Sequence, residues 1–444
     1  MTHSLPPHAL VIGGSLSGLL AARVLADHFS QVTIVERDEL PDGPQPRQGA
    51  PQARHAHVLL CRGARILERL FPGLEAEAIA LGAPPICWSL DSAGLLSAGW
   101  MPRFASDLRS YSASRDLLEW LVRQRMRANP RVRFVTGSTV NGLTTNAEKT
   151  RVTGVRLRRG NGADEEMSAD LVADVSGRTS HLATWLAGLG YGEVAVATVN
   201  AGLGYATRWY AIPADWEADW KLVLIAAQYP DNPRGAVVLP VEGQRWVVTL
   251  AGTGGHFPPT DEDGFLEFAR NLAGPQIYDA IRQAEPISPI SGYRRTENQW
   301  RHYEKMARWP AGLIALGDAV CAFNPVYGQG MSVGALGAEL LDRMIREGGV
   351  DALGKFQQRL AQALLTPWQL ATGDDFRWAG RTAGEATLGD RLMHRYLARV
   401  FALFDQPDVI YTFFSVTHLL APPTALFRPS LLWRALWAKP VDRQ

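Results

Sequence analysis

The sequence predicts an α/β fold in which a parallel sheet carries an inserted β-sheet domain and is followed by a helical C-terminal region. Three observations predict it: a strand–helix–strand unit opens the chain, short strands crowd its middle, and helical periodicity dominates beyond residue 330. The chain has 444 residues, of which 46% are hydrophobic, and this is enough for a large core and two subdomains.

The opening unit is read from hydrophobic periodicity. Residues 9–12 form a short apolar run that stops at Gly13, as a buried parallel strand does. Residues 16–28 place leucine and valine at helical spacing, and residues 32–36 form a second apolar run. Together they predict a βαβ unit.

The remaining elements set the expected domain boundaries. A nucleotide-binding part is expected over 1–195 and again over 301–345, with a β-rich substrate domain over 196–300 and a helical region over 346–444. Helices are expected near 56–70 and over 114–128, where Ser114 is the N-cap. Further strands are expected at 132–135, 152–158, 169–175, 221–227, 235–241, 245–251 and 312–317.

A glycine motif opens the first helix, in the order Gly13, Gly14, Ser15, Leu16, Ser17 and Gly18. In the dinucleotide fingerprint, the first glycine makes the tight turn, the second lets the backbone approach a pyrophosphate, and the third lets helix pack on strand. Gly13 and Gly18 fit this pattern, while Ser15 takes the middle position. We interpret Ser15 as a tolerated variant, because serine is small and its hydroxyl can donate to a phosphate.

Glu36 ends the second strand, where an acidic residue accepts hydrogen bonds from a ribose. With the strand, the helix and the glycines in place, it predicts a Rossmann-type dinucleotide site rather than only a tight turn.

A second motif lies about 300 residues later. Gly317 and Asp318 end a predicted strand, and a glycine-rich turn from Asn324 to Ser332 opens another helix near 330–345. Its N-terminus is able to stabilise an anion, and Asp318 is able to hold a polyol hydroxyl. A capped helix with a glycine hinge is the alternative. If the fold brings the two motifs together, they suit the two halves of a flavin dinucleotide.

With these motifs, the sequence resembles the FAD-dependent monooxygenase superfamily, which includes aromatic hydroxylases, squalene epoxidase and the geranylgeranyl reductases. Within it, the chain is most similar to the bacterial subgroup of polyether-antibiotic olefin epoxidases. The resemblance covers nearly the whole chain and rests on residues 11–23, 35–38, 51–57, 317–319 and 328–331.

The resemblance implies a Rossmann-type FAD-binding domain and a role for each matching residue. The first motif binds the ADP half of FAD together with Glu36 and Arg37, and Arg115 contacts FAD near its phosphates or ribose. In the second motif, which includes Gly317, Asp318 binds the ribityl chain and Pro325 lies beside the isoalloxazine. The backbone of Gly328, Gln329 and Gly330, followed by Met331, faces the pyrimidine ring.

The resemblance also implies the chemistry. One oxygen atom from O2 would enter an apolar small molecule by olefin epoxidation or hydroxylation in secondary metabolism, through a flavin C4a-hydroperoxide. A flavin-dependent reductase or desaturase of an alkene, and a non-redox cyclase that keeps FAD as a scaffold, are the alternatives.

One departure concerns the electron donor. Aromatic hydroxylases carry an Asp-Gly pair in a middle motif, and Ser176 stands at the position of that aspartate in the stretch from Asp174 to Ser180. In this respect the chain looks more like members that receive reduced flavin or electrons from a separate reductase. We therefore expect the electrons of NAD(P)H to arrive through a separate flavin reductase, with direct use of NAD(P)H as the alternative. The Trp-x-Trp-x-Ile-Pro signature of flavin halogenases is missing.

Arg54, His55 and His57 lie in the loop that is expected to fold over the flavin, and with Pro325 they are the catalytic candidates. A purely structural role in closing the loop is the alternative. Two histidines separated by one residue can also ligate a metal, but no third ligand is visible, so no metal site is expected.

The substrate is expected to be apolar, because the β-rich region shows no clear charged anchor. Four tryptophans of that region either line a pocket or fill the core: Trp209, Trp216, Trp220 and Trp246.

The composition excludes several functions. The net charge is +1 and no Lys/Arg block appears, which argues against nucleic-acid binding. Three scattered cysteines fit a reducing cytoplasm, and no signal peptide or membrane-length apolar run is visible. The aromatic C-terminal stretch 411–436 is expected to pack on the flavin domain. A peripheral membrane contact through Arg428, Arg434 and Lys439 is an open alternative.

Overall fold

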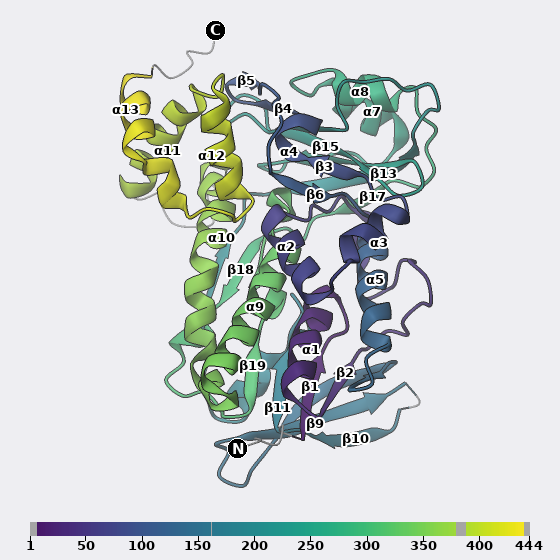
Figure 1. Cartoon of the computed structure of the whole chain (residues 1–444), viewed down its shortest axis with the longest axis vertical. Helices are drawn as coiled ribbons and strands as arrows, with labels where there is room; N and C mark the ends of the chain where they lie inside the picture. The colour runs from purple at the N-terminus through teal and green to yellow at the C-terminus, as the bar shows by residue number, and fades with distance from the viewer. Residues whose placement is uncertain (1–6, 161, 379–387, 439–444) are drawn as a thin grey trace.

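The computed structural model describes residues 7–160, 162–378 and 388–438. A five-stranded parallel sheet lies at one end of the molecule, near the N-terminus (Figure 1). Its strand order is β19 (Leu313–Ala315), β11 (Leu171–Asp174), β1 (His8–Ile12), β2 (Gln31–Val35) and β7 (Val132–Val135). The predicted Rossmann-type α/β core is confirmed.

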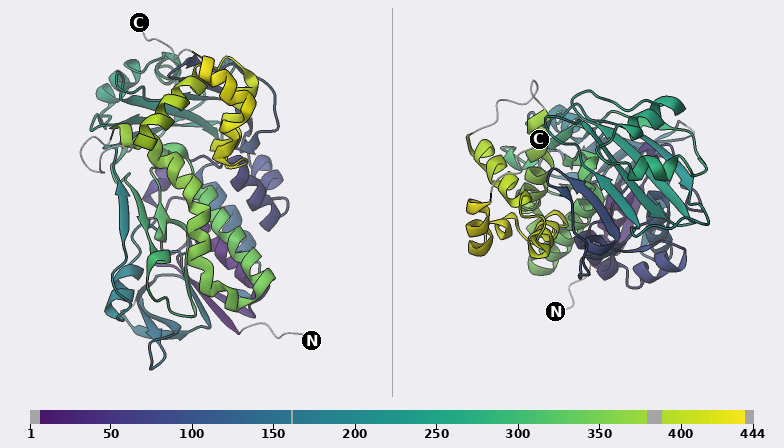
Figure 2. Two further views of the ribbon diagram at one scale, coloured as in Figure 1. Left: turned by 90° about the vertical axis from the view of Figure 1, so that its left-hand side faces the viewer. Right: turned by 90° about the horizontal axis from the view of Figure 1, so that it is seen from above.

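Helices cover this sheet, and the longest leads away from it. α1 (Leu16–His28) packs against α9 (Gly330–Gly348), and α10 (Phe356–Trp378) packs beside α9. Figure 2 shows α10 running from the parallel sheet toward the opposite end of the molecule. Four further helices contribute to the core that contains the parallel sheet: α2 (Cys61–Leu70), α3 (Leu74–Ala80), α5 (Arg115–Arg127) and α6 (Leu182–Gly188).

Ser114 caps α5 as expected, because its Oγ accepts from the Leu117 N–H at 3.0 Å. The helix expected near 56–70 begins only at Cys61. Before it, backbone N–H groups bind side chains of other elements: Ala56 donates to Thr249 Oγ1 and Leu60 to Ser332 Oγ. These bonds hold the segment in a non-helical form.

A seven-stranded sheet forms the other end of the molecule (Figure 1). Its order is β17 (Ser291–Tyr293), β13 (Gly204–Ala211), β16 (Arg245–Gly252), β15 (Arg234–Val241), β14 (Leu222–Ile225), β4 (Ser92–Leu96) and β5 (Gly99–Trp100). Strands β4 and β5 come from the range expected to belong to the nucleotide-binding part. Hydrophobic residues of α7 (Glu262–Arg270) and α8 (Gln276–Ile281) share a buried core with this sheet.

Smaller elements complete the fold. β8 (Ser138–Thr145), β9 (Val152–Arg159) and β10 (Asp164–Ser168) form one antiparallel sheet, and β12 (Val196–Val199), β18 (Asn298–Arg301) and β20 (Cys321–Ala322) form another. β3 (Pro85–Cys87) pairs with β6 (Arg109–Tyr111), and α4 (Trp88–Asp91) follows β3.

The four tryptophans singled out in the β-rich region pack in the core beside the seven-stranded sheet. Trp246 is 2% exposed, and its ring contacts those of Trp216 and Trp220 with centroids 5.1 and 6.2 Å away. These three rings join the core with α7 and α8, and Trp209 donates from Nε1 to the Arg54 carbonyl. None of the four lines the large cavity described below. Core packing, rather than pocket lining, describes them.

The expected packing of stretch 411–436 on the flavin domain is confirmed in part. Leu419 packs against the core that includes the parallel sheet, and His418 accepts hydrogen bonds from the Cys61 and Arg62 N–H groups at the start of α2. The larger hydrophobic core of α11 (Leu388–Phe401), α12 (Pro407–Thr417) and α13 (Pro429–Trp437) is shared with the β4–β5 edge of the seven-stranded sheet. Figure 1 shows them beside β5. Trp433 and Trp437 of α13 are exposed, and Lys439 lies outside the described residues. No described helix is both long and apolar enough to span a membrane.

Candidate functional site

One continuous cavity of about 1990 Å³ connects the parallel sheet to the seven-stranded sheet and the C-terminal helices. Its wall includes residues of both glycine motifs, so the fold brings the two motifs together as expected. The predicted residues in the wall are Gly13, Ser15, Ser17, Glu36, Arg37, His55, His57, Arg115, Asp318, Pro325, Gly328, Gln329, Gly330 and Met331.

Five predicted residues lie outside the wall. Arg54 is exposed, because it ends a short 3-10 helix (Pro51–Arg54) on the surface, and the structure does not bring it to the cavity. Leu16 is buried in the core instead, and Gly14, Gly18 and Gly317 are glycines at which an added Cβ would lie within 3.2 Å of a neighbouring atom.

The glycine turn has the geometry that a pyrophosphate site requires. Gly13 has φ +106° and lies against the Val175 carbonyl. A Cβ on Gly18 would lie 1.9 Å from the Gly13 carbonyl oxygen, so only glycine permits this approach of α1 to β1. The N-terminus of α1 therefore faces the cavity beside Gly13, with its positive dipole end toward an anion.

Glu36 is buried at the end of β2 and orders this turn. Its Oε2 accepts from the Gly14 N–H at 2.7 Å, and its Oε1 accepts from the Asp38 N–H at 3.1 Å. Because a carboxylate has about four acceptor positions, Glu36 retains positions for ribose hydroxyls.

Ser15 does not keep its hydroxyl proton for a phosphate, and this corrects the expectation. Its Oγ donates to Glu119 Oε2 at 2.8 Å and accepts from Arg115 Nη2 at 2.6 Å. Arg115 Nη2 also donates to Glu119 Oε2 at 3.0 Å. Ser15 thus ties the turn to a buried ionic cluster, and Arg115 supplies the positive charge that faces the cavity.

Two members of this cluster escaped sequence reasoning. Arg47, from the loop after β2, binds Glu119 at 2.9 Å and Asp38 at 2.7 Å. Although burial opposes ionisation, the Arg115 and Arg47 guanidinium groups lower the pKa of Glu119. The four-residue spacing of Arg115 and Glu119 was a usable signal, because such pairs meet on one helix face. Arg47 gave no such signal.

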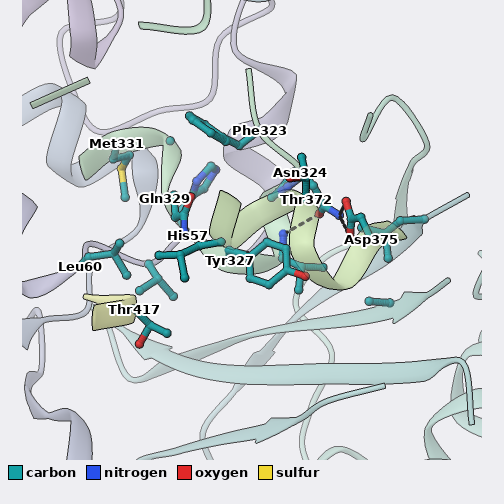
Figure 3. A pocket seen from close by; sticks show the side chains of 18 of the residues that line it. His57, Leu60, Phe323, Asn324, Tyr327, Gln329, Met331, Thr372, Asp375 and Thr417 are labelled. Atoms are coloured by element: carbon teal, nitrogen blue, oxygen red, sulfur yellow. Dashed lines mark hydrogen bonds between the residues drawn. The ribbon is translucent and has the colours of Figure 1, made fainter. Parts of the chain in front are cut away.

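The second motif presents polar groups to the cavity. Asp318 lies in the wall, where burial raises its pKa and the Arg178 cation opposes that rise. Gln329 precedes α9, is 2% exposed, and its Oε1 has no hydrogen-bond partner among the described residues. Figure 3 shows Gln329 and Met331 on the same side of the pocket as His57.

These features fit FAD. The Gln329 amide oxygen has no donor among the described residues and is therefore open to a donor from a ligand, since an unsatisfied buried acceptor is costly. A Cβ on Gly330 would meet nothing within 4 Å, so the backbone there is open to a flat ring. At the other end, Arg115 and the α1 N-terminus suit the two phosphates. The residues present therefore match both halves of the cofactor.

The two histidines are neutral groups near the second domain. His55 Nδ1 lies 2.8 Å from Thr207 Oγ1, and burial together with the Arg54 cation lowers the pKa of His55 to about 4. His57 Nε2 lies 2.9 Å from the Gln52 carbonyl, and burial with the Arg115 cation lowers the pKa of His57 to about 4. At neutral pH, each imidazole is uncharged and offers hydrogen bonding rather than an acid.

The middle motif closes the end of β11. The buried carboxylate of Asp174 accepts from the Ser176 and Ser180 hydroxyls and from the Ser176 N–H. Ser176 therefore supports Asp174 at the cavity wall. The described residues include no cluster of three metal-ligating side chains, and the three cysteines are free and buried.

Comparison with known proteins agrees with this geometry. A family model described as an FAD binding domain matches residues 7–345, which is most of the chain. The chain belongs to this FAD-binding family. It is also similar to Protein Rv3254 of Mycobacterium tuberculosis, with 38% identity over 350 residues that span 76% of this chain and 73% of that protein. FAD is therefore the cofactor of this flavoprotein.

Solved structures show the same fold at lower identity. CmlS, a flavin-dependent halogenase, superposes with a TM-score of 0.66 and 18% identity, covering 91% of this chain and 74% of that chain. PqsL of Pseudomonas aeruginosa, a probable FAD-dependent monooxygenase, gives a TM-score of 0.61 and 19% identity, covering 84% and 99%. At this identity the likeness concerns the fold alone.

The close approach at Gly18 predicts that Gly18→Ala weakens FAD binding. The added methyl group forces α1 away from β1, and overpacking of this kind costs about 1–3 kcal/mol, or roughly 5- to 150-fold in affinity. Fluorescence titration of the apoprotein with FAD measures the loss. Gly188→Ala is the control, because a Cβ there meets nothing within 4 Å. Equal affinity of the two variants would contradict the close-packing role.

The lowered pKa of His55 predicts a pH dependence of stability. Between the ordinary pKa of 6.5 and the folded value of about 4, the unfolded chain binds the proton more readily, so stability falls as the pH falls. His55→Asn keeps a hydrogen-bonding group beside Thr207 but cannot titrate. Between pH 7 and pH 5 we expect this variant to lose about 2 kcal/mol less unfolding free energy than the parent. Urea unfolding at both pH values is the measurement, and parallel losses would mean that His55 titrates normally.

Proposed function

We propose that this protein is an FAD-dependent monooxygenase that inserts one oxygen atom from O2 into an apolar small molecule, by olefin epoxidation or by hydroxylation. The observation that carries the proposal is the single cavity. It joins the FAD site to a wall of apolar side chains from the second sheet and the C-terminal helices. FAD, once reduced, supplies the chemistry with O2.

The wall beyond the flavin motifs supports an apolar substrate. From the sheet it takes Leu96, Leu222, Leu224, Val237 and Leu239, and from the C-terminal helices Leu397, Ala398, Phe401, Phe413, Phe414 and Phe427. Such a wall buries a hydrocarbon skeleton with few polar groups to satisfy.

Charged residues also line the cavity, and their positions are consistent with this substrate. Arg178 donates to the Glu297 and Phe323 carbonyls, and Asp375 accepts from the Asn298 and Asn324 amides. Arg295 and Arg395 have exposed side chains. The charges of Arg178 and Asp375 are therefore already bound by groups of the protein.

Several residues of the chain support oxygen chemistry. The C-terminal helices add apolar side chains to the cavity wall, and an apolar wall disfavours the water that would consume a reactive oxygen species. The N-terminus of α9, at Gly330, lines the cavity and would favour negative charge on a flavin ring bound beside it. Uncharged His55 and His57 are available as hydrogen-bonding groups that orient O2-derived oxygen or substrate.

The likeness to solved proteins supports the same class of chemistry. One neighbour is titled a probable FAD-dependent monooxygenase and another a flavin-dependent halogenase. The absence of the Trp-x-Trp-x-Ile-Pro signature from this sequence favours oxygen transfer over halogenation. For the electrons, we propose NAD(P)H, used directly or through a separate flavin reductase.

Rapid mixing tests the oxygenation. The FAD-loaded protein is reduced anaerobically with NADH, NADPH or dithionite and then mixed with O2, and isotopically labelled O2 is supplied with a panel of linear and cyclic olefins. We expect an absorbance transient distinct from reduced and oxidised FAD, and label in the product. Reduction by dithionite alone would indicate a partner reductase.

Other outcomes of that experiment contradict the proposal. If no transient forms with any reductant and no label enters a product, oxygenation is wrong. Conversion of an olefin without oxygen uptake would instead favour a reductase or desaturase. Turnover during which FAD stays oxidised would favour a cyclase.

The apolar part of the cavity gives a mutational prediction. Ala398→Phe adds a ring to the wall on α11, and we expect it to raise the KM for the accepted olefin about tenfold or more, because a filled pocket excludes its ligand. FAD affinity should stay unchanged. Leu392→Phe on the same helix is the control, because Leu392 is 56% exposed and does not line the cavity. Equal KM values in steady-state kinetics would place the substrate elsewhere.

A further inference from the structure

A buried polar group joins the C-terminal region to the turn that follows Asp318. It consists of Tyr205 on β13, Asn298 on β18, Asn324 before the turn, and Asp375 on α10. Each of the four residues is at most 5% exposed. Figure 3 shows the Asn324 and Asp375 side chains facing one another beside the pocket. Neither the motifs nor the family resemblance assigned a role to Asp375.

The orientation of both amides follows from their backbone bonds. Asn324 Oδ1 accepts from the Val326 N–H at 3.0 Å and from the Tyr205 hydroxyl at 3.2 Å, so its Nδ2 faces Asp375. Asn298 Oδ1 accepts from the Asn324 N–H at 2.7 Å, so its Nδ2 also faces Asp375. Two buried N–H donors thus converge on one side chain, and an ionised carboxylate is the group that only accepts.

The two carboxylate oxygens of Asp375 accept from different sets of donors. Asp375 Oδ2 accepts from Asn298 Nδ2 at 2.6 Å and from Asn324 Nδ2 at 3.0 Å. Asp375 Oδ1 contacts Asn324 Nδ2 at 3.2 Å. Hydrogen bonds to a buried charge are the stronger kind, so this carboxylate fixes both amides.

Asn324 also fixes the turn from Pro325 to Gly328, which lines the cavity. Its Oδ1 caps the short 3-10 helix Pro325–Tyr327, after which Gly328 adopts φ +62° and α9 begins. Pro325, Gly328 and Gln329 line the cavity. A shift of the Asn324 side chain would therefore move the wall that receives the ring of FAD.

We propose that Asp375 is a positioning residue that, through Asn298 and Asn324, holds the turn from Pro325 to Gly328 against the bound flavin. The same part of α10 lines the cavity with Thr372 and Phe376. One helix of the C-terminal region therefore shapes both the apolar wall and the flavin turn. The inference rests on FAD binding by this family and not on the proposed oxygenation, so the two fail independently.

A reciprocal exchange of side chains tests the proposal. Asn324→Asp alone places a carboxylate against Asp375, and Asp375→Ala leaves two buried donors without an acceptor. We expect each to weaken FAD binding about tenfold or more, and to change the visible spectrum of the bound flavin. Fluorescence titration of apoprotein and absorption spectra of FAD-loaded protein measure these effects.

The double variant Asn324→Asp/Asp375→Asn exchanges the amide and the carboxylate, so that one amide again faces one carboxylate. The new amide nitrogen takes the place of Asp375 Oδ1 and donates to the new carboxylate, while the remaining oxygen still accepts from Asn298. We expect FAD affinity and spectrum to return to within about threefold of the parent protein. Because this variant keeps one amide and one carboxylate at the two positions, it remains informative if Asp375→Ala does not fold.

Gln357→Ala is the control for a general loss of stability. Gln357 lies on the same helix, is equally buried at 4%, and donates to the Ala315 carbonyl at 3.1 Å. We expect it to lower the thermal midpoint while leaving the flavin spectrum unchanged. The proposal is overturned if Asn324→Asp keeps the parental affinity and spectrum, if the double variant shows no recovery, or if Gln357→Ala changes the spectrum as strongly as Asp375→Ala.

Discussion

The contact between α1 and α9 is the constraint on which the site depends. The two helices begin at glycine motifs separated by most of the nucleotide-binding sequence, and they meet through small residues. A Cβ on Gly334 would lie 2.2 Å from Ser17 Oγ, and one on Gly317 would lie 3.2 Å from the same atom. Larger side chains would separate the helices, and the phosphate end and ring end of the cofactor site would no longer share one cavity.

Charge is distributed unequally along this cavity. At the dinucleotide end, Arg47, Arg115 and Glu119 form a buried ionic cluster, of which the two arginines line the cavity. Farther along, His55 and His57 are uncharged, and most of the wall is aliphatic and aromatic, although Arg178 and Asp375 also line it. This gradient suits a cofactor with an anionic middle and a neutral ring, followed by an apolar substrate.

Sequence reasoning succeeded where structure is local. The βαβ unit, the Ser114 cap and the place of Glu36 follow from periodicity and from hydrogen bonds between near neighbours. It failed where partners are distant. The Ser15 hydroxyl is taken by Glu119, and Asp375 meets Asn298 and Asn324 only after the chain has folded. Strands β4 and β5 joined the second sheet because β4 pairs with β14, and no short-range pattern announces such pairing.

The cavity wall is divided between two parts of the chain. The match to the FAD-binding family model ends at residue 345. Helices α11 and α12, which line the apolar part of the cavity, follow that residue. The hydrophobic core of these helices includes side chains at the β4–β5 edge of the seven-stranded sheet. One part of the apolar wall is therefore encoded after the matched stretch, and the part from the seven-stranded sheet is encoded within it. Asp375 also follows the matched stretch, yet it binds Asn324 within that stretch through a hydrogen bond.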